Sequence, residues 1–214
     1  MKTVENLEKI SIMDANGKEI QGAIFNNAQE LWDSEQKQLT LIFDPARVKT
    51  GLAAHESLGR ALQPGKNYQL VIDGLESIHH QKMAKPFFKN IVVSEADLNP
   101  PDMNKWKVYT PNKNSLEELR IQFPEALDYL SLQQRVIVTN AKNIAISGNV
   151  NITKNETQWT FRPNQPWKTG NYKIQVNTRL EDPAGNNLNG LFDHKIGTLK
   201  DANEGTIKAI DFTL

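Results

Sequence analysis

Residues 168–176 read Lys-Thr-Gly-Asn-Tyr-Lys-Ile-Gln-Val, and residues 64–72 read Pro-Gly-Lys-Asn-Tyr-Gln-Leu-Val-Ile. Each stretch is a glycine turn followed by a tyrosine and by apolar residues at alternate positions. Alternation at period two is typical of a strand that buries one face. Because the arrangement occurs twice, the sequence indicates an internal repeat of a β unit.

The same alternation recurs elsewhere, at 39–43, 119–123 and 210–214. Turn-forming Gly, Asn, Asp and Pro residues separate these segments. Stretches of helical period are short, at 56–62 and 125–133, whereas the crossovers of parallel sheets need a dozen or more residues. The sequence therefore predicts an all-β fold of short antiparallel strands.

A proline-rich segment divides the chain. Pro100 and Pro101 cannot donate hydrogen bonds to a sheet and favour an extended spacer. We therefore place a linker at 97–104, between one domain at 1–96 and a second at 105–214. Trp106, just after the linker, is expected to pack across the joint between the domains.

The second half carries further motifs, Trp-Thr-Phe-x-Pro at 159–163 and Leu-Glu-Asp-Pro-Ala-Gly-Asn at 180–186. With the Gly-Asn-Tyr strand, they resemble bacterial Ig-like domains of the S-layer-protein type over most of residues 105–214. The first half is similar but degenerate, and Glu-Leu-Trp-Asp at 30–33 and the Phe-Asp-Pro segment at 43–52 resemble uncharacterised exported Ig-like proteins of bacteria.

That resemblance implies two tandem immunoglobulin-like antiparallel β-sandwich domains and export to the periplasm or cell surface. In such sandwiches Tyr68 and Tyr172 point inward, and the hydroxyl reaches a backbone carbonyl near the corner. Trp159 alternates with Phe161 and is expected in the core.

The start of the chain departs from this arrangement. Such a sandwich usually opens with an edge strand carrying Phe and Pro, which Phe123 and Pro124 provide for the second domain. The first domain begins at Met1, where that strand should already have ended. We expect an N-terminal strand, and with it an export signal, to be missing from the chain as given, because residues 1–17 have no apolar signal region.

Composition excludes several classes of partner. The 214 residues include 25 Lys or Arg and 25 Asp or Glu, so no net charge favours nucleic acid. The absence of cysteine excludes disulfides and thiolate metal sites. Apolar runs are far shorter than the roughly 20 residues of a membrane-spanning helix. The expected partner is an unidentified protein or glycan at the cell envelope, with no nucleic acid and no transmembrane segment.

The first half carries an insertion. Leu39 and Tyr68 are 29 positions apart, whereas Trp159 and Tyr172 are 13 apart, so about 16 extra residues lie at 44–60. Loops on rigid scaffolds often carry binding groups. The candidate ligand surface consists of Asp44, Arg47, Lys49, Glu56 and Arg60.

Two interpretations of this insertion remain open. Arg47 or Arg60 would bind a carboxylate, a sulfate or a sugar acid through paired N–H groups. Alternatively, the charges pair with one another, and Asp44 accepts hydrogen bonds from its own turn.

No metal or cofactor is expected. Glu181, Asp182 and Asn186 offer oxygens to Ca²⁺, but Asp and Asn at such turns usually bond their own backbone. His79 and His80 are adjacent, so on a strand they point to opposite faces and do not share a metal.

No catalytic residue is expected either, since Ser57 lies near His55 without a nucleophile elbow or an oxyanion hole. We predict a non-catalytic module pair acting as a structural, adhesive or binding element of the bacterial cell envelope. One alternative is a carbohydrate- or anion-binding accessory domain. A further alternative is an enzyme with an interdomain site, which requires carboxylates with perturbed pKa values.

Overall fold

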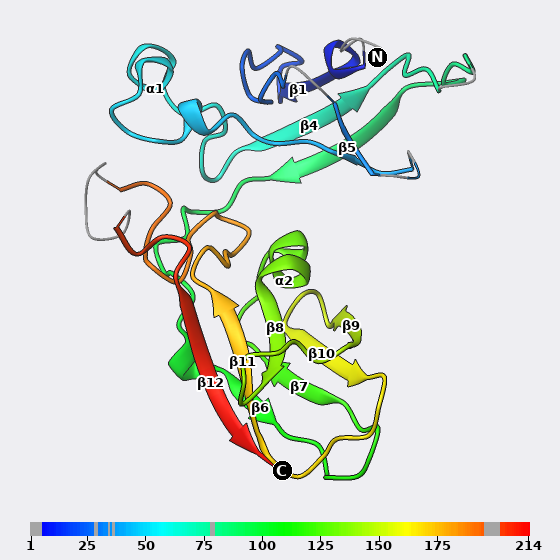
Figure 1. The fold of residues 1–214 in the computed structure, drawn as a ribbon. Coiled ribbons are helices and arrows are strands. Elements are labelled where there is room, and N and C mark those ends of the chain that lie inside the picture. The colour runs from blue at the N-terminus through cyan, green and yellow to red at the C-terminus, as the bar shows by residue number, and fades with distance from the viewer. Residues whose placement is uncertain (1–5, 28–29, 34, 36, 78–79, 195–201) are drawn as a thin grey trace. The chain divides into compact units, whose positions relative to one another are not determined.

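The computed structural model describes residues 6–27, 30–33, 35, 37–77, 80–194 and 202–214. It divides into two compact units, Met1–Ala96 and Asp97–Leu214 (Figure 1). Strands form most of the regular structure in both, and every strand pair is antiparallel. The all-β fold predicted from the alternating pattern is confirmed.

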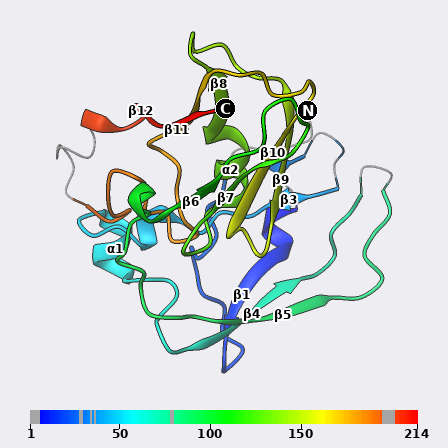
Figure 2. The ribbon, with the colours of Figure 1, turned by 90° about the horizontal axis from the view of Figure 1, so that it is seen from below.

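The first unit contains a three-stranded sheet in the order β1-β4-β5 and a two-stranded sheet, β2-β3. β4 lies between β1 and β5 (Figure 2). The elements of this unit are η1 (Leu7–Lys9), β1 (Ile10–Asp14), β2 (Leu31–Trp32), β3 (Leu39–Thr40), η2 (Pro45–Arg47), α1 (Ala53–Leu58), β4 (Asn67–Ile72) and β5 (Phe87–Val92).

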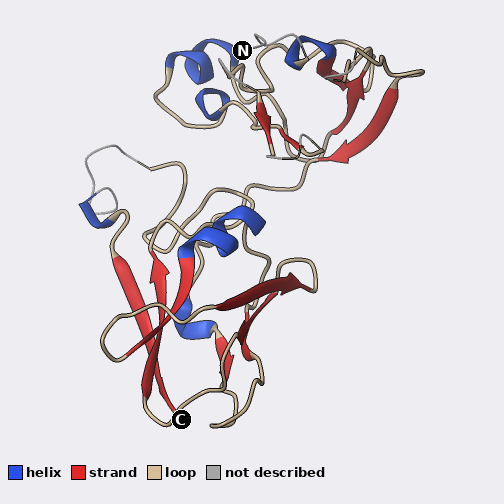
Figure 3. Ribbon diagram, turned by 45° about the vertical axis from the view of Figure 1, so that its right-hand side comes forward, coloured by secondary structure: helices blue, strands red, loops and turns tan. Residues whose placement is uncertain are grey.

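The second unit is an antiparallel β-sandwich (Figure 3). Its two sheets have the strand orders β6-β7-β10-β9 and β12-β11-β8. Its elements are η3 (Met103–Lys105), β6 (Lys107–Tyr109), β7 (Leu119–Gln122), α2 (Tyr129–Arg135), β8 (Val136–Asn140), β9 (Gly148–Thr153), β10 (Gln158–Pro163), β11 (Asn171–Asn177) and β12 (Ile207–Thr213). The expectation of an edge strand at Phe123 was wrong, because β7 lies between β6 and β10.

Alternating side chains of both sheets build the core of the second unit. Leu119, Ile121 and Trp159 are fully buried, and burying a side chain of this size contributes about 1.5–3 kcal/mol. Trp106 belongs to the same core, with its ring edge-on to Phe123 at a centroid distance of 4.9 Å. The expectation for Trp106 is therefore corrected, because its indole completes the core of its own unit.

The first unit has a much smaller core. Its buried cluster consists of Ile12, Ala23 and Tyr68, with partly buried residues around them. Large apolar side chains such as Phe43 and Phe88 remain about half exposed.

Both corner tyrosines hold the turn that precedes their strand. Tyr172 Oη accepts a hydrogen bond from Lys168 N at 3.1 Å and donates one to Lys168 O at 2.9 Å. Tyr68 Oη accepts one from Gln63 N at 2.9 Å. The predicted contact with a carbonyl is confirmed for Tyr172, whereas the hydroxyl of Tyr68 contacts an N–H group.

The sheets β1-β4-β5 and β8-β11-β12 share their order and the turn after their first strand. Asp14 Oδ1 accepts hydrogen bonds from the N–H groups two and four residues later, at 2.8 and 2.9 Å. Asn140 Oδ1 does the same at 2.9 and 3.0 Å. A shift of 126 residues aligns β1 and the turn after it with β8 and its turn. The cross-strand pairs Asp14–Tyr68 and Asn140–Tyr172 also correspond, although the two tyrosines are 104 positions apart.

The segment expected to act as a linker packs on the second unit. Pro101 is buried, and Asp102 caps η3 by accepting a hydrogen bond from Asn104 N at 3.0 Å. Asn186 Nδ2 donates to Asp97 O at 3.1 Å. These contacts fix residues 97–104 on the framework of the second unit.

Candidate functional site

The insertion at 44–60 folds into η2 and the single short helix α1. Asp44 begins η2, and its Oδ1 accepts a hydrogen bond from Ala46 N at 2.8 Å, while Pro45 supplies a preset backbone angle at the first position. Gly59 ends α1 with a φ of 69°, in the left-handed region that glycine tolerates. The carboxylate of Asp44 thus stabilises the local turn.

Arg47 lies inside the first unit, with 6% of its surface exposed. Its Nε donates to Gly59 O at 2.8 Å, Nη2 donates to Leu58 O at 3.4 Å, and Nη1 donates to Gln21 O. The three carbonyls come from the end of α1 and from a segment more than 20 residues earlier. The guanidinium therefore connects the insertion to the sheet framework.

The other predicted residues lie on the surface of the insertion. Glu56 is exposed, and its Oε1 accepts a hydrogen bond from Gly51 N at 3.0 Å and lies 3.8 Å from His55 Nδ1. Lys49 and Arg60 are half-buried. The side chain of Arg60 makes no hydrogen bond or ion pair with the described residues.

A cavity of about 130 Å³ brings three of the five predicted residues together. Asp44, Arg47 and Arg60 line it, along with the apolar side chains of Phe43 and Leu62. Lys49 and Glu56 do not line it. Its volume is well below the roughly 300–1,000 Å³ of a typical small-molecule site, so this cavity is large enough only for a small anion or for one anionic or apolar group of a larger ligand.

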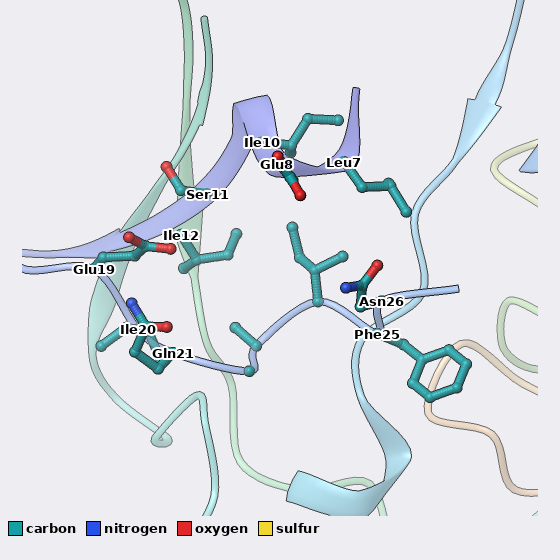
Figure 4. Close-up of a pocket in the computed structure, with 13 residues that line it drawn as sticks. Leu7, Glu8, Ile10, Ser11, Ile12, Glu19, Ile20, Gln21, Phe25 and Asn26 are labelled. Atoms are coloured by element: carbon teal, nitrogen blue, oxygen red, sulfur yellow. The ribbon is translucent and has the colours of Figure 1, made fainter. Parts of the chain in front are cut away.

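A second cavity in the first unit, of about 270 Å³, was not predicted. It lies between η1 and β1 on one side and the segment 19–26 on the other (Figure 4). Ile10 and Ile12 of β1 are among the residues that line it. A cavity has no signature in a single sequence, because it arises where the side chains of separate segments leave a space between them.

A larger groove lies in the second unit, with a volume of about 850 Å³. Residues 99–105, 188–190 and 208–210 line it, and Lys208 Nζ donates to Leu188 O at 3.1 Å. Sequence reasoning missed this groove, because its first wall was interpreted as a linker. The run Asn186–Gly190, which is rich in amide side chains, was the one signal in the sequence.

In the turn at 181–186, which was considered as a calcium site, the carboxylate oxygens of Asp182 accept hydrogen bonds from residues of the same turn. Asp182 Oδ1 accepts hydrogen bonds from Ala184 N and Asn186 N, and Oδ2 accepts one from Asn186 Nδ2, at 2.8 to 3.0 Å. Burial nevertheless raises the pKa of Asp182, and the nearby Asp97 carboxylate adds to this effect. Burial likewise raises the pKa of Glu125, with further contributions from Asp97 and Asp182.

The histidines are placed in part. His80 Nδ1 lies 2.6 Å from Glu76 Oε1, while His79 falls outside the described residues. Within the described ranges, no three His, Asp or Glu side chains gather closely enough to hold a metal ion. Of the helices in the same ranges, none has the length and apolar character needed to cross a membrane.

No curated protein matches the chain. A family model does match, and its span includes most of the segment interpreted as a linker and ends before β12. The second unit is thus similar, over residues 99–203, to the family described as the bacterial Ig-like domain.

Proposed function

We propose that the protein is a non-catalytic pair of Ig-like modules that acts as a structural, adhesive or binding element of the bacterial cell envelope. The observation that carries the proposal is the match of residues 99–203 to the bacterial Ig-like family on a complete β-sandwich. Sandwich domains serve many functions, so the fold supports the class of protein rather than a particular ligand.

The first unit is the degenerate module of the proposed pair. Its support is the shared strand order and the shared turn at Asp14 and Asn140, with the same spacing of hydrogen bonds. The tyrosines at 68 and 172 occupy corresponding positions in the central strands.

The hydrogen bonds of the potentially reactive side chains support a non-catalytic role. Ser57 Oγ donates to Ala53 O at 2.8 Å, within its own helix, so this hydroxyl is engaged by the backbone. The carboxylate of Asp182 is engaged by three donors of its own turn. These groups stabilise local structure.

The envelope location rests on the resemblance to S-layer-type domains, and cell fractionation tests it. An antibody against the chain should detect the protein in the periplasmic or surface fraction of the organism that encodes it. A cytosolic marker measured in the same fractions is the control. Recovery with that marker alone would contradict the proposed location.

Anion or carbohydrate binding at the insertion is the second candidate function. The observation that favours it is that Arg47 and Arg60 are among the residues that line one cavity. Because Arg47 holds the insertion in place, the test leaves it intact and combines Lys49→Ala with Arg60→Ala. Binding to a glycan and small-anion panel should fall at least about tenfold, a loss of about 1.4 kcal/mol.

A matched control removes two exposed positive charges elsewhere in the first unit, through Lys18→Ala and Lys66→Ala. Equal loss of binding in both double variants would show a general charge effect. No binding by the unmodified chain would favour a purely structural module.

A further inference from the structure

The sheet β6-β7-β10-β9 presents one face to the core of the second unit. Ile121 of β7 and Trp159 of β10 are cross-strand partners on that face, and both are fully buried. Because successive side chains of a strand point to opposite faces, the residues on either side of these two point outward. The outward positions of the four strands, all of which lie in the described ranges, carry cations, amides, hydroxyls and the ring of Tyr109, but no carboxylate.

The cations of this face lie on a diagonal across three strands. Arg120 of β7 is opposite Tyr109, and Lys107 lies two residues before that tyrosine on β6. Arg120 is also opposite Thr160, and Arg162 lies two residues further along β10. Diagonal neighbours on adjacent strands are about 7–8 Å apart. Lys107, Arg120 and Arg162 therefore form one line, which we call the basic stripe.

The protein does not neutralise the basic stripe. Lys107, Arg120 and Arg162 are exposed, and none of them forms an ion pair with a described residue. Glu118, directly before β7, is exposed and likewise forms no ion pair within the described ranges.

The outward face of the other sheet is built differently. Lys173 of β11 lies directly opposite Asp211 of β12, so a cation and a carboxylate are cross-strand neighbours. In the next row, Gln175 lies between Ile137 and Ala209. Unbalanced positive charge is thus a property of one face of the sandwich.

Arg120, at the centre of the basic stripe, is held in place by its neighbours. Its Cζ lies 4.1 Å from the ring centroid of Tyr109, within the range of a cation–π contact. Tyr109 Oη donates to Gln122 Oε1 at 3.4 Å, which connects the ring to β7. No described residue accepts a hydrogen bond from the guanidinium, so its N–H groups are positioned for a bidentate contact with a carboxylate.

Amide side chains flank the basic stripe. Gln122 and Gln158 are cross-strand partners beside it, and Asn149 and Asn151 lie on β9 at its other side. The side chains of Asn149 and Asn151 are exposed and make no hydrogen bond with the described residues. Because an amide both donates and accepts, it matches the hydroxyl groups of a sugar.

We propose that this face binds a linear polysaccharide that carries carboxylate groups and lies along the basic stripe. The carboxylates of the sugar chain pair with Lys107, Arg120 and Arg162, and its hydroxyls bond to the flanking amides. The proposal rests on the proposed function, because it assigns a ligand class to the binding element.

Other polyanions match this face less well. Single-stranded nucleic acid stacks its bases on exposed aromatic rings, whereas the ring of Tyr109 is covered by Arg120. Protein partners bind through aromatic and apolar anchors, whereas the positions around the basic stripe carry amides and hydroxyls. A sugar chain with hydroxyls between its carboxylates matches both kinds of side chain.

The test measures binding of the intact chain to polygalacturonate, a uronic acid polymer, by affinity electrophoresis. Fully methyl-esterified polygalacturonate, which has the same backbone without the charge, is the matched ligand. The chain should bind the charged polymer alone, and binding should weaken as salt rises, because exposed charges are screened. Absence of binding to polygalacturonate, or equal binding to the esterified polymer, would overturn the proposal.

Variants locate the site on the sheet. Arg120→Gln combined with Arg162→Gln should weaken binding at least about tenfold, a loss of about 1.4 kcal/mol. The matched control, Lys142→Gln combined with Lys173→Gln, removes the same charge from the side of the other sheet and should bind as the unmodified chain does. Tyr109→Leu keeps every charge but removes the ring beneath Arg120, and it should weaken binding about threefold.

Thermal unfolding of each variant verifies that the second unit remains folded. Equal loss in the two Gln double variants would overturn the proposal, as would equal retention of the chain by double-stranded DNA, because either result shows a general charge effect. Loss in the Lys49→Ala and Arg60→Ala variant alone would assign the ligand to the insertion and also overturn it. Since cell fractionation tests the envelope role separately, a chain recovered there that does not bind polygalacturonate would retain the proposed function and refute this site.

Discussion

The two units use one strand framework in different ways. In both, a three-stranded sheet, an Asx turn at Asp14 or Asn140 and a corner tyrosine are arranged alike. The second unit adds a four-stranded sheet and buries Phe161, whereas the first adds two short strands and leaves Phe43 half exposed. The local sequence is therefore enough to form the shared three-stranded sheet. Burial of the phenylalanine in the other sheet depends on whether a further strand pairs beside it, as β7 does beside Phe161.

The units also differ in the connection that follows Phe-x-Pro. In the second unit Trp167 closes the sandwich, with its ring in the core and its Nε1 donating to Glu117 O at 2.9 Å. In the first unit the connection is the insertion at 44–60, and the buried group is the guanidinium of Arg47. The connection after Phe-x-Pro is therefore anchored by a buried tryptophan, Trp167, in the second unit and by a buried arginine, Arg47, in the first.

Replacing the corresponding phenylalanines should produce the largest contrast. Phe161→Ala should lower the free energy of unfolding of the second unit by about 3–5 kcal/mol, because it leaves a cavity in a packed core. Phe43→Ala should cost less than about 1 kcal/mol, because its ring is already half in water. Denaturant-dependent hydrogen exchange measures the two units separately. A comparable loss for Phe43→Ala would mean that its face is covered in solution.

The buried guanidinium should give the next largest effect. Arg47→Ala leaves three carbonyls without their donor, so the first unit should lose about 2–3 kcal/mol of stability. Arg60→Ala, from the same insertion, should stay within about 0.5 kcal/mol. Urea unfolding followed by exchange at residues 53–58 measures both variants. Similar results for the two would show that Arg47 does not anchor the insertion.

Removing the corner hydroxyls sharpens the comparison on a smaller scale. Tyr172→Phe breaks hydrogen bonds to both the N–H and the carbonyl of Lys168 and should cost about 1–2 kcal/mol. Tyr68→Phe breaks one bond and should cost about 1 kcal/mol. The exposed Tyr109→Phe is the control, expected within about 0.5 kcal/mol by urea unfolding. A larger loss for Tyr68→Phe would reverse the predicted order.

A pH effect in the second unit should be the smallest. Burial and nearby carboxylates raise the pKa of Glu125, so its stabilising contribution is present below the ordinary carboxyl pKa and is lost as pH rises through the raised value. Glu125→Gln should therefore flatten the pH dependence and stabilise the unit at pH 7 by a few tenths of a kcal/mol, since solvent screens much of the effect. Thermal unfolding between pH 4 and pH 7 measures the slope. A slope unchanged by the substitution would contradict the predicted contribution.

Locally encoded features could be predicted from the sequence. Alternation identified β4, β7, β11 and β12, because a side-chain period of two is a property of the strand itself. Trp159 was placed correctly in the core on the same basis. The Gly-Asn-Tyr entry into the central strand identified the hydroxyl contact of Tyr172.

Features that depend on distant segments could not be predicted. The burial of Arg47 depends on carbonyls at positions 21, 58 and 59, and a charged residue in a loop looks solvated in a sequence. The groove in the second unit joins residues 99–105 to residues more than 80 positions later. Trp106 was misplaced because nothing in the sequence shows which unit supplies its neighbours.

The position of β12 also has a consequence during synthesis. The sheet β8-β11-β12 is complete only when residues 207–213 have left the ribosome, whereas the sheet of the first unit needs nothing beyond Val92. At about 5–20 residues per second, the intervening stretch takes on the order of ten seconds to translate. During that interval the nascent chain carries a folded first sheet beside an unfinished sandwich, and this is when chaperones would have the most exposed apolar surface to bind.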